Sequence, residues 1–474
     1  MTFTTPSRSD TRTVDVAPLG DRPRSVLAAL LASAAVVLTA ACTESTSGGT
    51  KVQGQDVQSA GGAEDAAADG QDGSDGSDGA LDATDGQDAT DAVDGDDGAI
   101  DGTEGEDGVD ATDNADRIDF DPVTTNEKGL TPELSFTVPE DAISFHITAV
   151  TTGETGITIG LLQDPVGTYL VPKAWYNSPL NQGPSLCLGC RIRVVGAESA
   201  QGVLVPNTTE QSVKPGKYKL SFFTYTTTQG NVFEAPVTTP IEAQVTAHVL
   251  IRRSSNGPPA ESILNLNLHF TGAGGLSADN APDDPRIKKA LQTFKDIYAQ
   301  RGIAVGEVRY KDIDAGLKKI ESISGPGNDF ALVARLTEGN EEGINVIFVD
   351  SITESSNPFG GFVVILGVAG GIPGPAGVQG TAKSAVFVSL QDFSAQGGPS
   401  PDEGIGQVMA HECGHYLGLF HSSENSSGGQ GIHDPLPDTE ENDASNLMYF
   451  AGSGSNLSEG QGFVLRNNPW VVPK

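Results

Sequence analysis

The chain has 474 residues, too many for one compact core, and this length predicts two or three folded units joined by linkers. Only 37% of the residues are hydrophobic and 19% are charged, while 59 are glycine, which indicates a large share of loop or unfolded chain. The net charge of -35, with no strongly basic stretch, argues against nucleic acid as a partner.

Residues 1–42 have the pattern of an export signal. Arginines precede an apolar run from Val26 to Leu38 that is too short to span a bilayer, and small residues then lead to Cys42. This ending resembles the bacterial lipobox, although its leucine is displaced by one position. The resemblance implies a lipid on Cys42 that holds the mature protein at the outer membrane or cell surface. Cleavage near Ala41 without lipidation, which would give an extracellular protein, is the alternative.

Residues 43–119 predict a disordered, acidic linker. They contain no aromatic residue, and the stretch from Glu64 to Asp116 holds 20 acidic residues with no Lys or Arg. Such a segment cannot bury enough apolar surface to offset the entropy lost on ordering. The spacing of its Asp-Gly pairs matches neither a calcium-binding β-helix repeat nor an EF-hand, so we interpret it as a solvated tether.

Residues 120–255 predict an all-β sandwich. Apolar and polar residues alternate in several short segments that are separated by Pro and Gly turns, without a helical stretch between them. His146 and His248 fall at outward positions of their strands and are interpreted as solvent-exposed. Cys187 and Cys190 are close enough to form a local disulfide, the interpretation we favour for an exported chain, over a redox pair or half of a metal site. The alternating segments lie at 134–138, 143–147, 218–222 and 245–251.

Residues 411–421 read H-E-C-G-H-Y-L-G-L-F-H. Positions four apart return to one face of a helix, so His411 and His415 can bind one metal ion, with Glu412 beside it. Gly418 can adopt positive φ, end the helix and turn the chain back, so that His421 becomes the third ligand. Three neutral histidines leave one coordination position open, which is typical of a catalytic rather than a structural Zn²⁺ site.

The helix that carries these residues is predicted from Pro401 to Leu417. Ser400 is its expected N-cap, followed by proline in the first turn and Glu403 as the capping-box acid. Cys413 lies about 200° around this helix from His411, so its thiol is expected in the supporting core rather than at the metal.

The histidine motif, with the sequence Asn-Leu-Met-Tyr around Met448 located 27 residues after His421, resembles the metzincin superfamily of zinc proteases. The resemblance implies that residues 256–474 form an α+β catalytic domain with a mixed sheet, a zinc helix and a Met-turn in which Met448 lies beneath the ligands. The upstream order fits this fold. We expect a strand at 264–270 with its leucines inward and Asn265, Asn267 and His269 outward. A helix capped by Asp284 and beginning at Pro285 follows, and then strands at 303–310, 344–352 and 384–390.

The same resemblance implies a secreted or surface-anchored zinc endopeptidase that hydrolyses protein or peptide substrates, with Glu412 as the catalytic base. Substrate is expected to lie along the strand at 384–390. The alternative is a surface binding or adhesion lipoprotein with a vestigial protease domain.

The residues around the histidine motif are compatible with more than one subfamily and with more than one role. The region before Met448 is similar to pappalysin-type enzymes and His421-Ser422 to matrixins, and a latent form with Cys187 or Cys190 capping the zinc is a further possibility. His433 is interpreted as a surface residue. The acidic loop around it contains candidate Ca²⁺ ligands, which a solvated loop explains equally well: Glu424, Asp434, Asp438 and Asp443.

Overall fold

The computed structural model describes residues 41–44 and 115–474, except for 154, 179–180, 182, 229–236, 326, 340, 358–360, 392–400, 425–431 and 451–453. Nearly all of the predicted signal peptide and acidic linker therefore lies outside the described residues. The strand β2 (Ala115–Thr124) begins inside the predicted linker, so folded chain starts before residue 120. The described residues are mostly β-structure with few helices, and none of these helices is long and apolar enough to cross a membrane.

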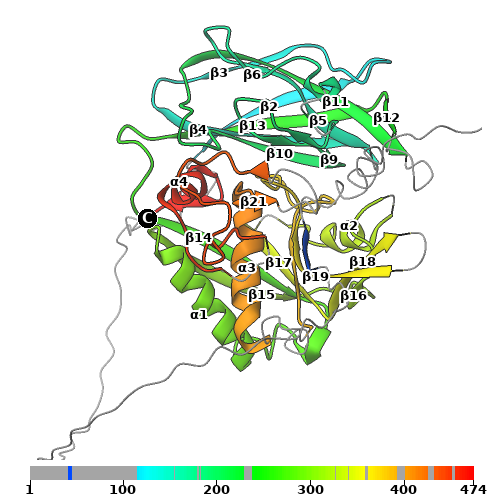
Figure 1. Ribbon diagram of the computed structural model, residues 1–474, viewed down its shortest axis with the longest axis vertical. Coiled ribbons are helices and arrows are strands. Elements are labelled where there is room, and N and C mark those ends of the chain that lie inside the picture. The colour runs from blue at the N-terminus through cyan, green and yellow to red at the C-terminus, as the bar shows by residue number, and fades with distance from the viewer. Residues whose placement is uncertain are drawn as a thin grey trace, which may run out of the picture. The chain divides into compact units, whose positions relative to one another are not determined.

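The N-terminal part of the described chain forms two facing antiparallel sheets (Figure 1). One has the order β10-β4-β13-β2 and the other contains β12-β11-β5-β6 with β3 and β9 paired at its sides. Large side chains such as Phe136, Phe145 and Phe222 are buried between them in one hydrophobic core. The strands are β3 (Leu134–Val138), β4 (Ala142–Thr151), β5 (Gly156–Gln163), β6 (Tyr169–Val171), β9 (Ala197–Glu198), β10 (Ala200–Val205), β11 (Gly216–Thr228), β12 (Val237–Pro240) and β13 (Gln244–Arg253). We call this part the sandwich.

The C-terminal part is built on a mixed sheet with the order β15-β14-β17-β20-β19-β18-β16. The strands β14, β15, β17 and β20 run parallel, whereas β19 is antiparallel to both β20 and β18. The C-terminal strand β23 (Val471–Pro473) pairs antiparallel with β14. The strands are β14 (Ser262–Phe270), β15 (Ile303–Asp312), β16 (Lys319–Ile320), β17 (Ile344–Val349), β18 (Ser351–Asn357), β19 (Gly361–Ala369) and β20 (Val386–Ser389).

Two helices, α1 (Pro285–Ala299) and α3 (Pro401–Leu417), pack together over the sheet (Figure 1). Asp284 caps α1 by accepting from the Arg286 N–H, and the apolar stripe of α1 enters the same core as α3. The helices lie close because α3 has a glycine at their contact: a Cβ on Gly406 would lie 2.7 Å from the carbonyl oxygen of Ala290. A second core contains α2 (Asp329–Ala334) and residues of β17, β19 and β20.

The outward positions of Asn267 and His269 are not exposed to solvent. Both are buried on β14, where the Asn267 amide and the His269 Nε2 each contact Asn345 Oδ1 of β17. Alternation along a strand predicts which residues share a face, but it does not show that the polar face is also covered.

The expectation that substrate lies along residues 384–390 is also wrong, because β20 has no open edge. It pairs with β17 on one side and with β19 on the other. The outer strand in this region is β19. On one side of it, Ile365 pairs with β18 and Val368 pairs with β20. On its other side, β19 pairs antiparallel with β1 (Ala41–Glu44).

The predicted exposure of His146 and His248 is wrong as well. These histidines lie on the face of the sandwich that packs on the connection between β19 and β20, and both are buried. His248 Nε2 lies 2.7 Å from the carbonyl oxygen of Ala376, and Thr148 exchanges hydrogen bonds with the Ala376 main chain. Burial, with the cation of Arg117 as the next cause, lowers the pKa of His248 to about 4. Burial, followed by the charge of His248, lowers the pKa of His146 to about 3.

These histidines predict acid sensitivity. Their folded pKa values lie below the unfolded value near 6.5, so their full contribution to stability is present above pH 6.5 and is lost as the pH falls towards 4. Each of these two histidines should lower the free energy of unfolding by about 2 kcal/mol at pH 5 relative to pH 8. Urea unfolding at both pH values should show a smaller loss in His248→Gln than in wild type, by about that amount. An equal loss in the two proteins would contradict this assignment, because all other titrating groups are common to both.

Candidate metal centre

The helix α3 has the predicted bounds, and it carries His411 and His415 on consecutive turns with Glu412 directly after His411. It ends at Gly418, whose φ is +113°, a conformation that side chains other than glycine rarely adopt. The Gly418 N–H donates to the carbonyl of His415 at 2.8 Å, and the chain then turns back towards His421. Ser400, the predicted N-cap, lies outside the described residues.

The three histidines meet at one point. His421 Nε2 lies 3.1 Å from the Nε2 atoms of both His411 and His415. Their relative exposures are 0, 1 and 4% for His411, His415 and His421, so water has almost no access to the rings. Among the described residues, this is the group of three or more His, Cys, Asp or Glu side chains whose ligand atoms lie close enough to hold one metal ion.

Main-chain carbonyl groups determine which nitrogen is protonated in two of these imidazole rings. His411 Nδ1 lies 2.6 Å from the carbonyl oxygen of Leu447, and His415 Nδ1 lies 2.8 Å from that of Leu419. A carbonyl only accepts, so both rings carry the proton on Nδ1 and direct a lone pair from Nε2 towards the other histidines. Burial is the main cause that lowers the pKa of His411 to about 3 and that of His415 well below its usual value, so the rings are neutral, as metal binding requires.

The donor set fits a metal ion. If His421 carried its proton on Nε2, that N–H could donate to the Nε2 of His411 or to that of His415, but not to both. A metal cation between the rings would accept a lone pair from all three Nε2 atoms. Tetrahedral zinc with Zn–N bonds of about 2.0–2.1 Å separates two ligand nitrogens by roughly 3.3 Å. The observed spacing of 3.1 Å is close to that separation. The residues therefore suit zinc with one coordination position left for a further ligand.

Glu412 lies between the histidines in sequence and is fully buried beside the strand β19. A Cβ built on Gly367 of β19 would lie 2.6 Å from Glu412 Cγ and 2.9 Å from Glu412 Oε1. Glycine at this position allows the carboxyl group to lie against the outer strand of the sheet. Any larger residue at position 367 would displace it.

Met448 is fully buried and lies against α3. A Cβ on Gly414 would be 2.9 Å from Met448 Sδ, so this glycine lets the sulfur approach α3 between His411 and His415. The turn is held by Asn446, whose Oδ1 accepts from the Met448 N–H and from Gln461 Nε2. Gln461 also belongs to the capping box of α4 (Glu459–Asn467). Asn446 and Gln461 thereby place the Leu447 carbonyl that orients His411.

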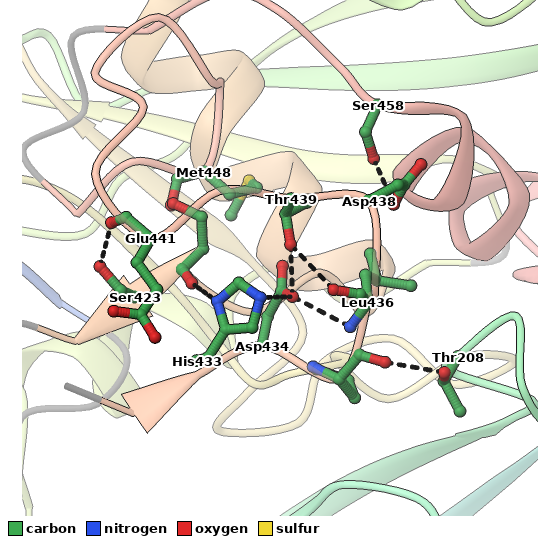
Figure 2. Close-up of polar contacts among 12 residues, drawn as sticks. Thr208, Ser423, His433, Asp434, Leu436, Asp438, Thr439, Glu441, Met448 and Ser458 are labelled. Atoms are coloured by element: carbon green, nitrogen blue, oxygen red, sulfur yellow. Dashed lines mark hydrogen bonds and ion pairs between the residues drawn. The ribbon is translucent and has the colours of Figure 1, made fainter. Parts of the chain in front are cut away.

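Asp434, Asp438 and Asp443, the candidate calcium ligands whose side chains the structure describes, do not converge on one point. Asp438 accepts from Ser458 and the Gly460 N–H, and Asp443 accepts from Ser445. Asp434 is buried and accepts from Thr439 and the Leu436 N–H (Figure 2). The side chain of Glu424 lies outside the described residues. These carboxylates thus cap or brace separate turns.

His433 differs from its prediction as a surface residue. Its side chain is one-third exposed, at 33%, and its Nδ1 lies 2.5 Å from the carbonyl oxygen of Ser422, the residue directly after His421. Figure 2 shows His433 beside Asp434. The His433 Nε2 lies 3.8 Å from Asp434 Oδ1.

The cysteines take separate roles. Cys187 and Cys190 form a disulfide in the sandwich, so neither is a free thiolate that could cap the metal in this structure. Cys413, on α3, is fully buried in the core that this helix covers. Burial raises the pKa of its thiol well above the usual range. The side chain of Cys42 lies outside the described residues.

The prediction from sequence missed Gly367 and Gln461, and it named Asn446 only as part of the motif around Met448. The serine and glutamine at 458 and 461 match a capping box, and that signal could have located α4. Nothing local marks Gly367, whose role depends on the distant helix α3.

No protein-family model matches the chain, and no curated protein matches it either. Among solved structures, metalloproteinase-II from Bacteroides fragilis aligns over 46% of this chain and 62% of its own, with 14% identity and a TM-score of 0.26. A structure of infectious bursal disease virus, Gx strain, covers 30% and 31% with 16% identity and a TM-score of 0.15. An active-site mutant of a family two carbohydrate esterase from Clostridium thermocellum covers 50% and 66% with 8% identity and a TM-score of 0.12. This chain covers less than two thirds of each, and scores this low carry no argument about function.

Proposed function

We propose that this chain is a zinc-dependent endopeptidase of the metzincin kind, in which His411, His415 and His421 hold the metal and Glu412 is the catalytic base. The observation that carries the proposal is the convergence of three buried Nε2 atoms on one point beside a buried carboxyl group. Structural zinc sites close their coordination shell with four protein ligands, whereas three ligands next to an acid suit hydrolysis.

A zinc ion held there would supply Lewis acidity towards a water molecule and the carbonyl to be cleaved. Glu412 takes the proton from that water and returns it to the leaving amine as the peptide bond breaks. The carboxyl group is placed for this by α3, and the small residue Gly367 keeps room for it.

The outer edge of β19 supports an extended substrate. Ala41 pairs with Val368 and Thr43 with Ile365, so this edge accepts an extended chain in antiparallel register. Gly367, in the same stretch, is the residue that contacts Glu412. A peptide bound along β19 would therefore pass beside the catalytic carboxyl group. Such a peptide must displace Ala41–Glu44.

Proteolysis by the purified full chain tests the proposal. We expect cleavage of casein that is abolished when a chelator removes the metal and restored by stoichiometric zinc. Cleavage that persists in a demonstrably metal-free protein would contradict the zinc mechanism. A zinc-loaded, folded protein that cleaves neither casein nor gelatin would favour the alternative of a surface adhesion lipoprotein with a vestigial protease domain.

We also propose that Cys42 carries a lipid that anchors the exported chain in the outer membrane, because an apolar run and small residues lead to it. Fractionation of expressing cells should place the wild type with membranes and Cys42→Ala in the soluble fraction. Equal solubility of the two proteins would mean that Cys42 is not the anchor.

A further inference from the structure

The sandwich touches the segment that carries the third histidine of the metal centre. Phe420, directly before His421, packs in a small apolar cluster with Leu186 of the sandwich and with Ile372 of the connection between β19 and β20. Leu188, within the disulfide-closed loop, and Val195 of the sandwich pack on the same cluster. The side chain next to the metal ligand is thus held by residues from a separate β-module.

Arg193 of the sandwich adds polar contacts to this cluster. Its guanidinium lies over the Phe420 ring, 5.6 Å from the ring centroid, and its Nη1 donates to the carbonyl oxygen of His433 at 2.9 Å. The Arg193 main chain is fixed in turn by Asn207, whose amide both accepts from and donates to it. The guanidinium is therefore presented from a braced loop towards two residues of the C-terminal part.

These two residues support the chain on either side of His421. Phe420 precedes it, and His433 Nδ1 donates to the carbonyl of Ser422, which follows it. Residues 423 and 433 also pair as short antiparallel strands, β21 (Ser423–Glu424) and β22 (Ile432–His433). The Ser422 N–H donates to the Met448 carbonyl at 2.9 Å. The backbone on the C-terminal side of His421 is thus held between the Met-turn and the segment that Arg193 contacts.

A second contact joins the sandwich to the same segment. Thr208 Oγ1 donates to the carbonyl of Pro435 at 2.8 Å. Figure 2 shows Thr208 on the side of this segment where the hydrogen bond is drawn. Asp434, between His433 and Pro435, is buried, and this burial raises the pKa of its carboxyl group to about 6, although the nearby Arg193 guanidinium acts in the opposite direction. Arg193 therefore meets hydrogen-bonding, aromatic and electrostatic partners within one short stretch.

We propose that Arg193 is a positioning residue for His421, and that the sandwich thereby forms part of the metal centre and sets its affinity for zinc. The inference rests on the proposed metal site but not on proteolysis. Without the guanidinium, the segments on either side of His421 lose a shared support, and the third imidazole is held less well in the geometry that zinc requires.

The test compares Arg193→Met with Arg191→Met in the full chain. Methionine keeps a long apolar side chain and removes the guanidinium, and Arg191 is an exposed arginine on the same loop, which makes it a matched control. We expect zinc affinity, measured by chelator competition, to fall roughly 10–100-fold in Arg193→Met and to stay at the wild-type value in Arg191→Met. The visible spectrum of the Co²⁺-substituted protein should change only in Arg193→Met, because it reports ligand geometry rather than global stability.

Two further variants keep the inference falsifiable if Arg193→Met folds poorly. Arg193→Lys retains the charge but loses the planar fork and should lie between wild type and Arg193→Met, while Thr208→Val should weaken zinc binding through the neighbouring contact. Wild-type zinc affinity and Co²⁺ spectrum in Arg193→Met and Arg193→Lys would overturn the inference, even if their melting temperatures fell. A wild type that binds zinc without cleaving casein would remove only the proposed protease function, and zinc affinity would still decide the role of Arg193.

Discussion

The structure depends on one constraint, the convergence of three buried imidazole nitrogens that carry lone pairs. Two of these rings have their proton fixed on Nδ1 by the carbonyls of Leu447 and Leu419, so their Nε2 atoms can only accept. Lone pairs that converge at 3.1 Å in a buried place are unfavourable unless a cation lies between them. The glycine turn after α3, the Met-turn and the packing of Phe420 all serve to hold this arrangement.

Support for the site comes from parts of the chain that are far apart in sequence. The Met-turn orients His411 through a main-chain carbonyl, and α4 holds that turn through the Asn446–Gln461 amide pair. The sandwich contacts the segments around His421 and packs on the connection between β19 and β20. Because β19 also lies beside Glu412, the sandwich is coupled to the site at two places. In our account the sandwich is therefore an integral part of the candidate metal centre rather than an independent module.

Sequence predicted the features that depend on local spacing. The helix from Pro401 to Leu417, its end at Gly418 and the cap of α1 at Asp284 all follow from short-range chemistry and lie where the pattern placed them. The errors concern contacts between distant segments. Whether His146 is exposed depends on which surface of the sandwich is covered. The position of the substrate depends on which strand is outermost, and the periodicity of the sequence encodes neither of these. Strand β19 was overlooked because β20, which follows it in sequence, is inserted between it and β17.

The most direct test of the account is Glu412→Gln, measured for zinc content, melting temperature and peptide hydrolysis in the same preparation. Glutamine keeps the shape of the side chain but cannot take up a proton, and the three histidines are unchanged. The account predicts a full complement of zinc, a melting temperature close to wild type and hydrolysis reduced by roughly 10²–10⁴-fold or more. Near-wild-type turnover in the zinc-loaded Glu412→Gln protein would contradict it.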